Sequence, residues 1–351
     1  MRYILLIDMD YFFVACEELR RTELKNLPVA VVTNTQREGS KGVIMTCNYN
    51  ARSFGIRSGM PAIQGLSLNQ NLILIKEDFS YYEQKSNEVY NIIKKFSSTV
   101  EQVSVDESFV DISDRVDSKE NAIEYATKIK NCINIDAQLP CSIGIGPNKL
   151  VAKMACDFAK PNGLKFVGPD IAKEFLSDLP VQKLYGIGEK TRKRLDEIGI
   201  KKVGELAKSN KMMLIEKFGS VGLELYNNAN GIDDSEVITN YEVKSIGRER
   251  TLDKDTMEYS AIILVFNRIC NEIIFEVQKE HYLFGIVTVK IRYSDFVDQL
   301  KSRTIKPSDN LNDLNKVATE LFISNVEQGR AVRKVGVRIS GLIKAAKQKR
   351  L

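Results

Sequence analysis

Three acidic residues stand where short apolar strands are expected to end or to bend. Asp8 follows the apolar run 3–7, and the pair Asp106 and Glu107 lies inside segment 100–112, which resembles two strands meeting at a tight bend. Separate strands of one sheet can bring such carboxylates close together. Crowded carboxylates repel one another and shift each other's pKa unless a cation neutralises them. Magnesium suits this role, because it prefers oxygen ligands and keeps coordination positions for water and substrate phosphates.

Two magnesium ions in such a site would support an in-line displacement at a phosphate. Ions held about 4 Å apart lower the pKa of an attacking hydroxyl and stabilise the leaving oxygen. An isolated acidic dipeptide is a weak signal, since most such pairs lie in solvated turns. Here the flanks strengthen it, because Ser104-Val-Asp-Glu-Ser-Phe109 places acids between strand formers, where surface turns usually carry Gly or Asn. The sequence therefore favours metal-dependent nucleotide chemistry.

The elements that must position these acids alternate between strand and helix over residues 1–160. This mixed α+β order, with helices returning to an antiparallel-looking sheet, fits a ferredoxin-like module. Residues 171–230 carry only short helical signals, 231–242 are polar and acidic like a linker, and 244–341 return to α+β. We expect helices at 11–19, 79–96, 119–133, 261–277 and 311–327, and strands at 3–7, 29–32, 43–46, 72–75, 141–145, 285–293 and 332–340.

The net charge of +5 is unevenly distributed along the chain. Residues 1–160 hold 19 Lys and Arg against 20 Asp and Glu, whereas residues 161–351 hold 32 against 26. The segment 330–351 contains eight basic residues and no acidic one. A near-neutral first half followed by a basic second half suits a catalytic module with appendages that bind a polyanion. For the end of the chain alone, a solvated surface with a disordered basic tail is the alternative.

The composition narrows the class of protein. A chain of 351 residues is expected to form roughly two to four domains. No apolar run reaches the ~18 residues of a membrane span, and the apolar N-terminus is too short for a signal peptide. The six cysteines show neither a C-x-x-C pair nor zinc-ligand spacing, so we expect reduced, mostly buried thiols in the cytosol. The single histidine argues against histidine-based catalysis.

Five ordered motifs resemble those of the Y-family, or translesion, DNA polymerases, and are closest to the archaeal and bacterial DNA polymerase IV (DinB-like) branch. Two shorter matches, Lys244-Ser-Ile-Gly-Arg248 and Arg333-Lys-Val-Gly-Val-Arg338, continue the series. The pieces occur in the family's order and span nearly the whole chain, which makes the resemblance highly specific. The five motifs are Asp8-Met-Asp-Tyr-Phe-Phe13, Cys47-Asn-Tyr-Asn-Ala-Arg52-Ser-Phe-Gly-Ile-Arg-Ser-Gly-Met-Pro61, Ser104-Val-Asp-Glu-Ser108, Ser142-Ile-Gly-Ile-Gly146 and Ala159-Lys-Pro-Asn-Gly163.

The resemblance implies a multidomain α+β fold with a ferredoxin-like palm, small fingers, an all-helical thumb and an α+β little finger. In the thumb, segment 184–195 followed by 198–200 looks like a helix-hairpin-helix. Its Gly186-x-Gly188 turn would offer backbone N–H groups to a phosphate, with Lys190 close by. The implied domains are palm and fingers at 1–166 (fingers about 20–77), thumb at 167–230, linker at 231–243, little finger at 244–341 and basic tail at 342–351.

The resemblance also implies which residues bind metal. The side chains of Asp8, Asp106 and Glu107 would act as catalytic acids and metal ligands, and the carbonyl group of Met9 would contribute a further oxygen. Asp10 is expected to be structural.

The same resemblance implies contacts to nucleotide and DNA. Phe13 would be the sugar gate, whose ring leaves no room for a 2′-hydroxyl. Arg52 can bind phosphate oxygens bidentately, Tyr49 donates one hydrogen bond and Lys160 acts as a point charge. Thr46 completes the expected nucleotide contacts. The residues expected to contact DNA are Gly186, Gly188, Lys190, Arg248, Arg333 and Arg338.

The implied activity is that of a template-directed DNA polymerase of low fidelity. It would extend a primer with dNTPs past damaged template bases, without a proofreading exonuclease, using two Mg²⁺ per active site with Mn²⁺ as a substitute. A cytoplasmic monomer that binds primer–template DNA and no membrane is expected. Relatives often end in a sliding-clamp motif with paired aromatics, and none is visible in the tail. Val43 and Met45 stand where relatives often carry smaller side chains over the nascent base pair. The sequence alone therefore does not define how large a damaged base the active site admits.

Two other classes of protein are alternatives to a DNA polymerase. Nucleotidyl cyclases share a similar palm sheet and two-metal acids, but they lack a helix-hairpin-helix and a basic C-terminal module. A DNA-binding scaffold that has lost catalysis conflicts with the complete acid set. A primer-extension assay with magnesium separates all three.

Overall fold

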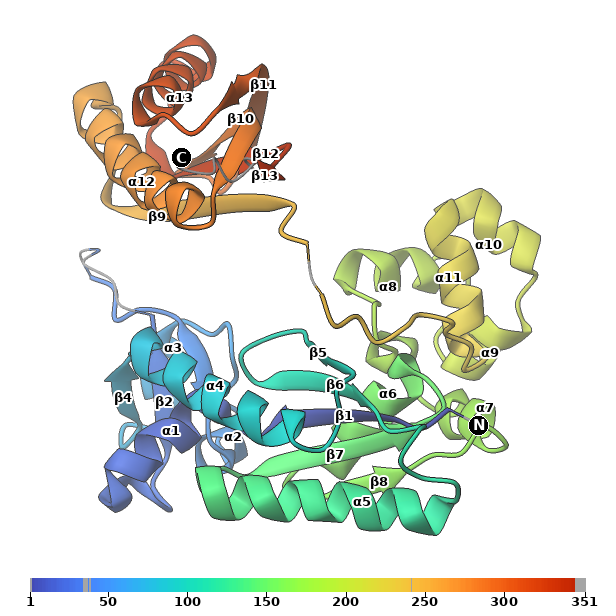
Figure 1. Cartoon of the computed structure of the whole chain (residues 1–351). Coiled ribbons are helices and arrows are strands. Elements are labelled where there is room, and N and C mark those ends of the chain that lie inside the picture. The colour runs from blue at the N-terminus through green and yellow to red at the C-terminus, as the bar shows by residue number, and fades with distance from the viewer. Residues whose placement is uncertain (1, 34–36, 38, 241, 345–351) are drawn as a thin grey trace, which may run out of the picture. The chain divides into compact units, whose positions relative to one another are not determined.

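The chain forms two compact units, each with its own hydrophobic core (Figure 1). The structure, a computed structural model, describes residues 2–33, 37, 39–240 and 242–344. The first unit comprises Met1–Asn34 and Gly42–Asn240, and the second comprises Thr35–Lys41 and Tyr241–Leu351. The mixed α+β class expected from the sequence is confirmed.

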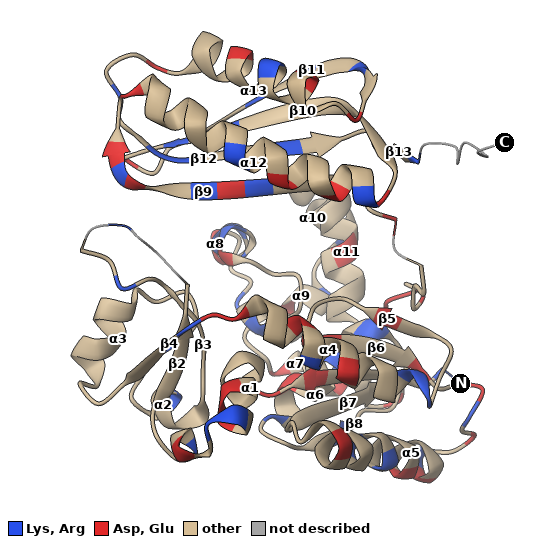
Figure 2. Ribbon diagram, turned by 60° about the vertical axis from the view of Figure 1, so that its left-hand side comes forward, with Lys and Arg blue, Asp and Glu red and all other residues tan. Residues whose placement is uncertain are grey.

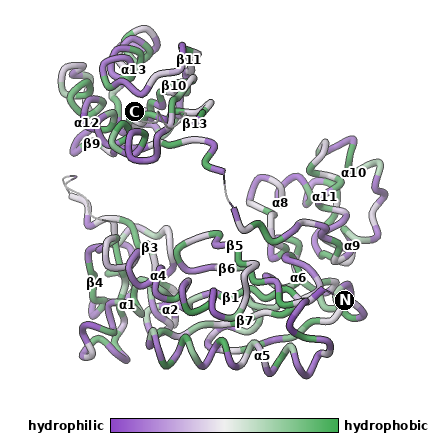
Figure 3. The backbone as a smooth tube through the Cα atoms, in the orientation of Figure 1, coloured by the Kyte–Doolittle hydropathy of each residue, from purple (hydrophilic) through white to green (hydrophobic). Residues whose placement is uncertain are grey.

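The first unit is built on a five-stranded sheet with β1 at its centre. The order is β5-β6-β1-β7-β8, in which β1 pairs antiparallel with β6 and β7, and β8 joins β7 in parallel. This sheet fits the expected ferredoxin-like palm, and Figure 3 shows hydrophobic colouring along its central strands β1 and β7. The strands are β1 (Ile4–Met9), β5 (Val100–Gln102), β6 (Glu107–Asp111), β7 (Cys141–Gly146) and β8 (Leu164–Phe166).

Alternation along β1 decides which side chains meet which helices. Leu5 and Ile7 belong to the main core, together with residues of α4 and α5, whereas Ile4 and Leu6 pack against α6. Because side chains of a strand point alternately to opposite faces, Asp8 follows Ile4 and Leu6 on the α6 face. The helices around the sheet are α1 (Phe12–Arg20), α4 (Phe79–Lys94), α5 (Lys119–Cys132) with the π-helix η2 (Ile133–Ala137), and α6 (Lys149–Ala159).

Helix α6 lies unusually close to the strand beneath it. A Cβ atom at Gly144 of β7 would stand 2.0 Å from the carbonyl oxygen of Ala152 and 2.2 Å from the amide nitrogen of Cys156. Only glycine permits this approach, because such overlaps cannot be relieved by side-chain movement. The approach brings the polar side chains at the end of α6 within reach of β1.

A small second sheet, of order β3-β2-β4, lies in the segment expected to form the fingers. The strand expected at 43–46 begins at Ile44, while Val43 makes an isolated bridge to Pro61. The Asn48 side chain accepts hydrogen bonds from the amides of Ala51 and Val29, so it caps α2 and fastens it to β2. The elements are η1 (Thr22–Leu24), β2 (Val29–Val32), β3 (Ile44–Cys47), α2 (Tyr49–Ser53), α3 (Ala62–Leu68) and β4 (Ile73–Lys76).

The residues expected to form the thumb are helical, as the short helical signals predicted, and they share a core cluster with Leu150 and Met154 of α6. The segment that follows, expected to be a linker, is docked in its first part. Val237 is buried with Ile4 and Leu6, and the amide of Ile238 donates to the carboxylate of Glu101. The helices are α7 (Ala172–Ser177), η3 (Val181–Lys183), α8 (Glu189–Asp196), α9 (Val203–Lys208), α10 (Lys211–Phe218) and α11 (Ser220–Ala229).

The second unit is a sheet of order β11-β10-β12-β9 covered on one face by two helices. Residues Val335, Val337 and Ile339 of β12 are buried beneath the helices, and Arg338 between them is exposed. Of the basic tail, residues 345–351 lie outside the described part of the chain. The elements are β9 (Ser245–Thr256), α12 (Tyr259–Lys279), β10 (Tyr282–Tyr293), β11 (Asp298–Ser308), α13 (Leu311–Asn325), β12 (Val332–Ser340) and β13 (Ile343–Lys344).

Candidate active site

One cavity of about 240 Å³ in the first unit brings together every residue expected to bind metal or nucleotide. The walls come from the end of β1, the start of α1, the strand β3 with α2, and the bend before β6. Asp10, Tyr11, Phe12, Met45 and Ser58 also line it, although they were not expected as ligands. The expected residues in its lining are Asp8, Met9, Phe13, Thr46, Tyr49, Arg52, Asp106, Glu107 and Lys160.

Asp8 and Glu107 are direct cross-strand partners. The register of β1 and β6 sets their Cα atoms opposite each other, and Asp8 is only 3% exposed. Burial alone would raise the pKa of Asp8, but its hydrogen bond with Glu107 and the nearby Lys160 ammonium hold that pKa below its usual value. Burial and the hydrogen bond to Asp8 raise the pKa of Glu107 to about 7. Of the two carboxylates, Glu107 therefore takes up a proton more readily than Asp8.

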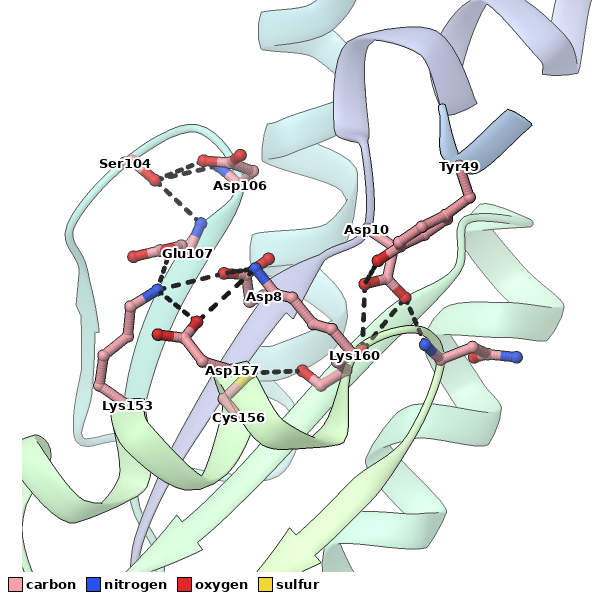
Figure 4. A network of polar contacts seen from close by, with 12 residues as sticks. Asp8, Asp10, Tyr49, Ser104, Asp106, Glu107, Lys153, Cys156, Asp157 and Lys160 are labelled. Atoms are coloured by element: carbon pink, nitrogen blue, oxygen red, sulfur yellow. Dashed lines mark hydrogen bonds and ion pairs between the residues drawn. The ribbon is translucent and has the colours of Figure 1, made fainter. Parts of the chain in front are cut away.

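Two lysine ammonium groups balance the charge of this pair (Figure 4). The Nζ of Lys160 lies 2.6 Å from Oδ2 of Asp8, and the Nζ of Lys153 lies 2.6 Å from Oε1 of Glu107 and 3.4 Å from Oδ2 of Asp8. Lys160 was expected at a phosphate, whereas Lys153 was missed. No motif signals Lys153, since it is one of two lysines on α6 and reaches the site only through the close packing of that helix.

Asp106 occupies a different environment from its neighbour Glu107. The hydroxyl of Ser104 donates to Oδ1 of Asp106 at 2.6 Å, and the amide of Met9 donates to the Asp106 carbonyl oxygen at 2.9 Å. Burial raises the pKa of Asp106, and the hydrogen bond from Ser104 opposes that rise. The bend thus keeps the third carboxylate at the cavity but turned toward Ser104.

The donor set fits a hard divalent cation in its chemistry, because the carboxylates of Asp8, Asp106 and Glu107 line one cavity and supply oxygen ligands. Within the described ranges, however, no group of three or more acidic, cysteine or histidine side chains is arranged to hold a metal ion. The lysines lie against Asp8 and Glu107, and Ser104 holds Asp106. Rotations of these side chains would be required for the carboxylates to converge on a cation.

Asp10 has the structural part expected for it. It is 1% exposed, and its carboxylate accepts hydrogen bonds from the hydroxyl of Ser142, the amide of Asn162 and the hydroxyl of Tyr49. These contacts join β1, β7 and α2. Asp10 is thus held by protein donors at the wall of the cavity.

The residues expected at the triphosphate form one wall of the cavity. The Arg52 guanidinium lies 4.8 Å from the centre of the Tyr49 ring, and its Nε donates to the carbonyl of Cys47 at 3.0 Å. Burial and the charge of Asp10 raise the pKa of the Tyr49 phenol, so it remains a hydrogen-bond donor. One edge of the Arg52 guanidinium is used in orienting the side chain, which leaves its terminal nitrogens for an anionic ligand.

Phe13 also lines the cavity and forms part of an aromatic stack. Its ring lies 4.7 Å from that of Tyr82 at an interplanar angle of 25°, and meets Phe79 edge to face at 6.2 Å. Tyr82 is fully buried, and its hydroxyl donates to buried Glu17 at 2.8 Å. Phe13 therefore rests on a ring that is itself fixed.

The turn expected to contact a DNA phosphate is open. Gly186 has φ of +90°, Gly188 precedes α8 as its N-cap, and an added Cβ would meet no atom within 4 Å at either position. Lys190 is exposed beside them. Arg192, by contrast, pairs with acidic residues of its own helix.

Lys and Arg residues occur along several strands of the second unit (Figure 2), and their side chains lie on different faces of the sheet. Arg338 is exposed on the face without helices. Arg248 points to the helical side, where its Nη2 lies 2.6 Å from Glu276 of α12. Arg333 stacks on the ring of Phe296 at 4.6 Å, next to an irregularity in the β12 register. This arrangement favours Arg338 over Arg248 and Arg333 as a phosphate contact.

Comparisons with known proteins agree along the whole chain. Residues 7–157 match the impB/mucB/samB family, residues 169–200 match the IMS family HHH motif, and residues 243–351 match the impB/mucB/samB family C-terminal domain. The chain is 36% identical to DNA polymerase IV of Lactococcus lactis over 97% of its length and 94% of the relative's. The chain belongs to the Y-family of DNA polymerases.

Further relatives place it in the DNA polymerase IV branch. DNA polymerase IV 1 of Methanosarcina mazei is 38% identical, covering 100% of this chain and 98% of the relative, and DNA polymerase IV of Nitrosopumilus maritimus is 34% identical, covering 99% and 98%. A solved Y-family DNA polymerase chimera superimposes with a TM-score of 0.90 at 30% identity, covering 98% of this chain and 100% of its own. The enzyme is thus a metal-dependent DNA-directed DNA polymerase with a low-fidelity, translesion character, and primer–template DNA and dNTPs are its substrates.

In the part of the polymerase that the structure describes, no helix is both long and apolar enough to cross a membrane.

Proposed function

We propose that the polymerase extends a primer at the 240 Å³ cavity, with Asp8, Asp106 and Glu107 as metal ligands and catalytic acids. The cross-strand pairing of Asp8 with Glu107 beside Asp106 carries this proposal. Two Mg²⁺ ions bound there, or Mn²⁺ in their place, would supply a lowered pKa at the primer hydroxyl and stabilise the departing pyrophosphate oxygen. The carbonyl of Met9 would add an oxygen ligand.

The remaining cavity residues orient the nucleotide. The terminal nitrogens of Arg52 and the phenol of Tyr49 would donate to triphosphate oxygens, and Lys160 would leave Asp8 for a phosphate as charge accumulates. Thr46 would complete the contacts. The Phe13 ring would lie under the sugar and exclude a 2′-hydroxyl, because its support by Tyr82 prevents it from moving aside.

DNA would be held outside the chemical site. The Gly186–Gly188 turn with Lys190 would bind a backbone phosphate, and the exposed sheet face carrying Arg338 would bind others. Arg248 and Arg333 stay predicted contacts that first have to leave their present partners. These contacts read shape, which suits a template with a damaged base.

The domain division of 1–166, 167–230, 231–243 and 244–341 is part of the proposal. So are a monomeric state and a cytoplasmic location. Clamp binding by residues 342–351 receives no support from a motif in that segment.

A primer-extension assay tests the function. Asp106→Asn and Glu107→Gln should each abolish extension with Mg²⁺, while affinity for primer–template stays within a few-fold, because the phosphate contacts lie elsewhere. Lys149→Gln is a matched control, since Lys149 pairs with Glu101 and not with the cluster. Extension at the parental rate by either acid variant would show that this site does not catalyse nucleotide addition.

A further inference from the structure

Lys153 contacts more carboxylates of the proposed site than Lys160 does, although it does not line the cavity. Its ammonium contacts three carboxylates: Glu107 at 2.6 Å, Asp8 at 3.4 Å and Asp157 at 3.4 Å (Figure 4). The Lys153 side chain is only 12% exposed, so these contacts are made largely out of water. The close approach of α6 at Gly144 fixes the backbone from which it extends.

Asp157 differs from the other two carboxylates that Lys153 contacts. It stands one turn further along α6, its side chain is 43% exposed, and it lies at the edge of the cluster rather than on the strands. It also lies 3.9 Å from the ammonium of Lys160. Asp157 is thus a second carboxylate within reach of both lysines that now neutralise Asp8 and Glu107.

We propose that Lys153 is a counter-ion of the metal site. Its ammonium pairs with Glu107 and Asp8 when no divalent cation is bound, and it moves to pair with Asp157 when one binds. This inference rests on the proposed metal site. Buried carboxylates without a cation would repel one another, so a lysine stabilises the metal-free fold. A divalent cation bound to these carboxylates would repel the Lys153 ammonium beside them and compete with it for their oxygens. Metal binding therefore favours displacement of Lys153, and Asp157 keeps the displaced charge paired.

Lys153 is in this sense a positioning residue, and its role predicts competition with metal. Full-length protein without DNA or nucleotide should be titrated with Mn²⁺ alone, with free Mn²⁺ followed by electron paramagnetic resonance. Removing the competing ammonium in Lys153→Gln should tighten Mn²⁺ binding about tenfold. Lys153→Arg retains the charge and should stay near the parental affinity. Lys149→Gln removes the same charge one turn earlier on α6, from a pair with Glu101, and should change affinity less than about twofold.

The acceptor is tested by a double-mutant cycle. Asp157→Asn should weaken Mn²⁺ binding roughly threefold, because Lys153 then has no other carboxylate to take it. In the Lys153→Gln background the same change should have a clearly smaller effect. Equal effects in both backgrounds would show that Asp157 acts only through its charge and would overturn the transfer.

Thermal unfolding provides an independent measurement. Metal-free Lys153→Gln should melt below the parent, and Mn²⁺ should raise its melting temperature by more than it raises the parent's. Asp8→Asn tests the metal site separately from the counter-ion, since it should abolish Mn²⁺ binding. Unchanged binding in Asp8→Asn would refute the metal site itself. Lost binding there, with Lys153→Gln no tighter than Lys149→Gln, would refute the counter-ion alone.

Discussion

Replacing Phe13 by alanine should open the polymerase to ribonucleotides. The ring is stacked at 4.7 Å on Tyr82, which is 1% exposed and hydrogen-bonded to Glu17. A 2′-hydroxyl that needs the space of the ring would have to push both rings into a filled core. Forcing an extra group into such packing costs about 3 kcal/mol. At about 1.4 kcal/mol per tenfold, this gives roughly 150-fold selectivity that Phe13→Ala should remove.

The assay compares kcat/KM for a matched ribonucleotide and deoxynucleotide opposite one template base, in the parent and in Phe13→Ala. Efficiency with the deoxynucleotide should change much less than the ratio, because the carboxylates and Arg52 remain. Phe79→Ala is the matched control: Phe79 touches the Phe13 ring at 6.2 Å, is 55% exposed and does not line the cavity. If the ratio barely moves in Phe13→Ala, or moves equally in Phe79→Ala, Phe13 is only a core aromatic.

Three further predictions concern DNA binding, thiols and packing. Primer–template affinity should fall with salt at a log–log slope of about −0.9 per phosphate contact, and Arg338→Ala should reduce the slope by about one; an unchanged slope would exclude Arg338 from the DNA surface. At pH 8 in the native protein a thiol reagent should react quickly with Cys132 alone, because burial raises the pKa of thiols such as Cys141 to about 12; rapid reaction of all six would contradict the buried state. Gly144→Ala should lower the free energy of unfolding by about 3 kcal/mol or more, since its Cβ would lie 2.0 Å from a carbonyl oxygen of Ala152; urea unfolding identical to the parent's would refute the close approach.

The positions of the three acids proposed to bind metal could be predicted because they depend on local patterns. An apolar strand that ends in an acid, and an acidic pair at a bend between strand formers, define which backbone carries the carboxylates. The pleat then sets Asp8 on the same face as Ile4 and Leu6, opposite Leu5 and Ile7. Both helices predicted in the second unit, 261–277 and 311–327, have strong periodicity and were found as α12 and α13.

The strands β9 and β11 could not be predicted, because their residues do not resemble a strand in isolation. Ser245–Thr256 and Asp298–Ser308 are rich in charged residues and mostly exposed. Their conformation comes from pairing with β12 and β10, which supplies backbone hydrogen bonds that no local pattern announces. The sequence also does not predict on which face of the sheet an arginine lies, as the contrast between Arg248 and Arg338 shows.

The position of Lys153 could not be predicted from the sequence either, and it affects the charge of the proposed metal site. Its partners Glu107 and Asp8 are 46 and 145 residues away in the sequence, so only the packing of α6 on β7 and β1 brings them together with Lys153. That packing depends on Gly144, a residue with no chemical group to contribute. The electrostatics of the site thus depend on two conditions. Strand alternation places the carboxylates on one face of the sheet, and the lack of a side chain at Gly144 lets α6 approach so that its lysine can neutralise them. A substitution at Gly144 should therefore disturb metal affinity as well as stability, although it touches no carboxylate.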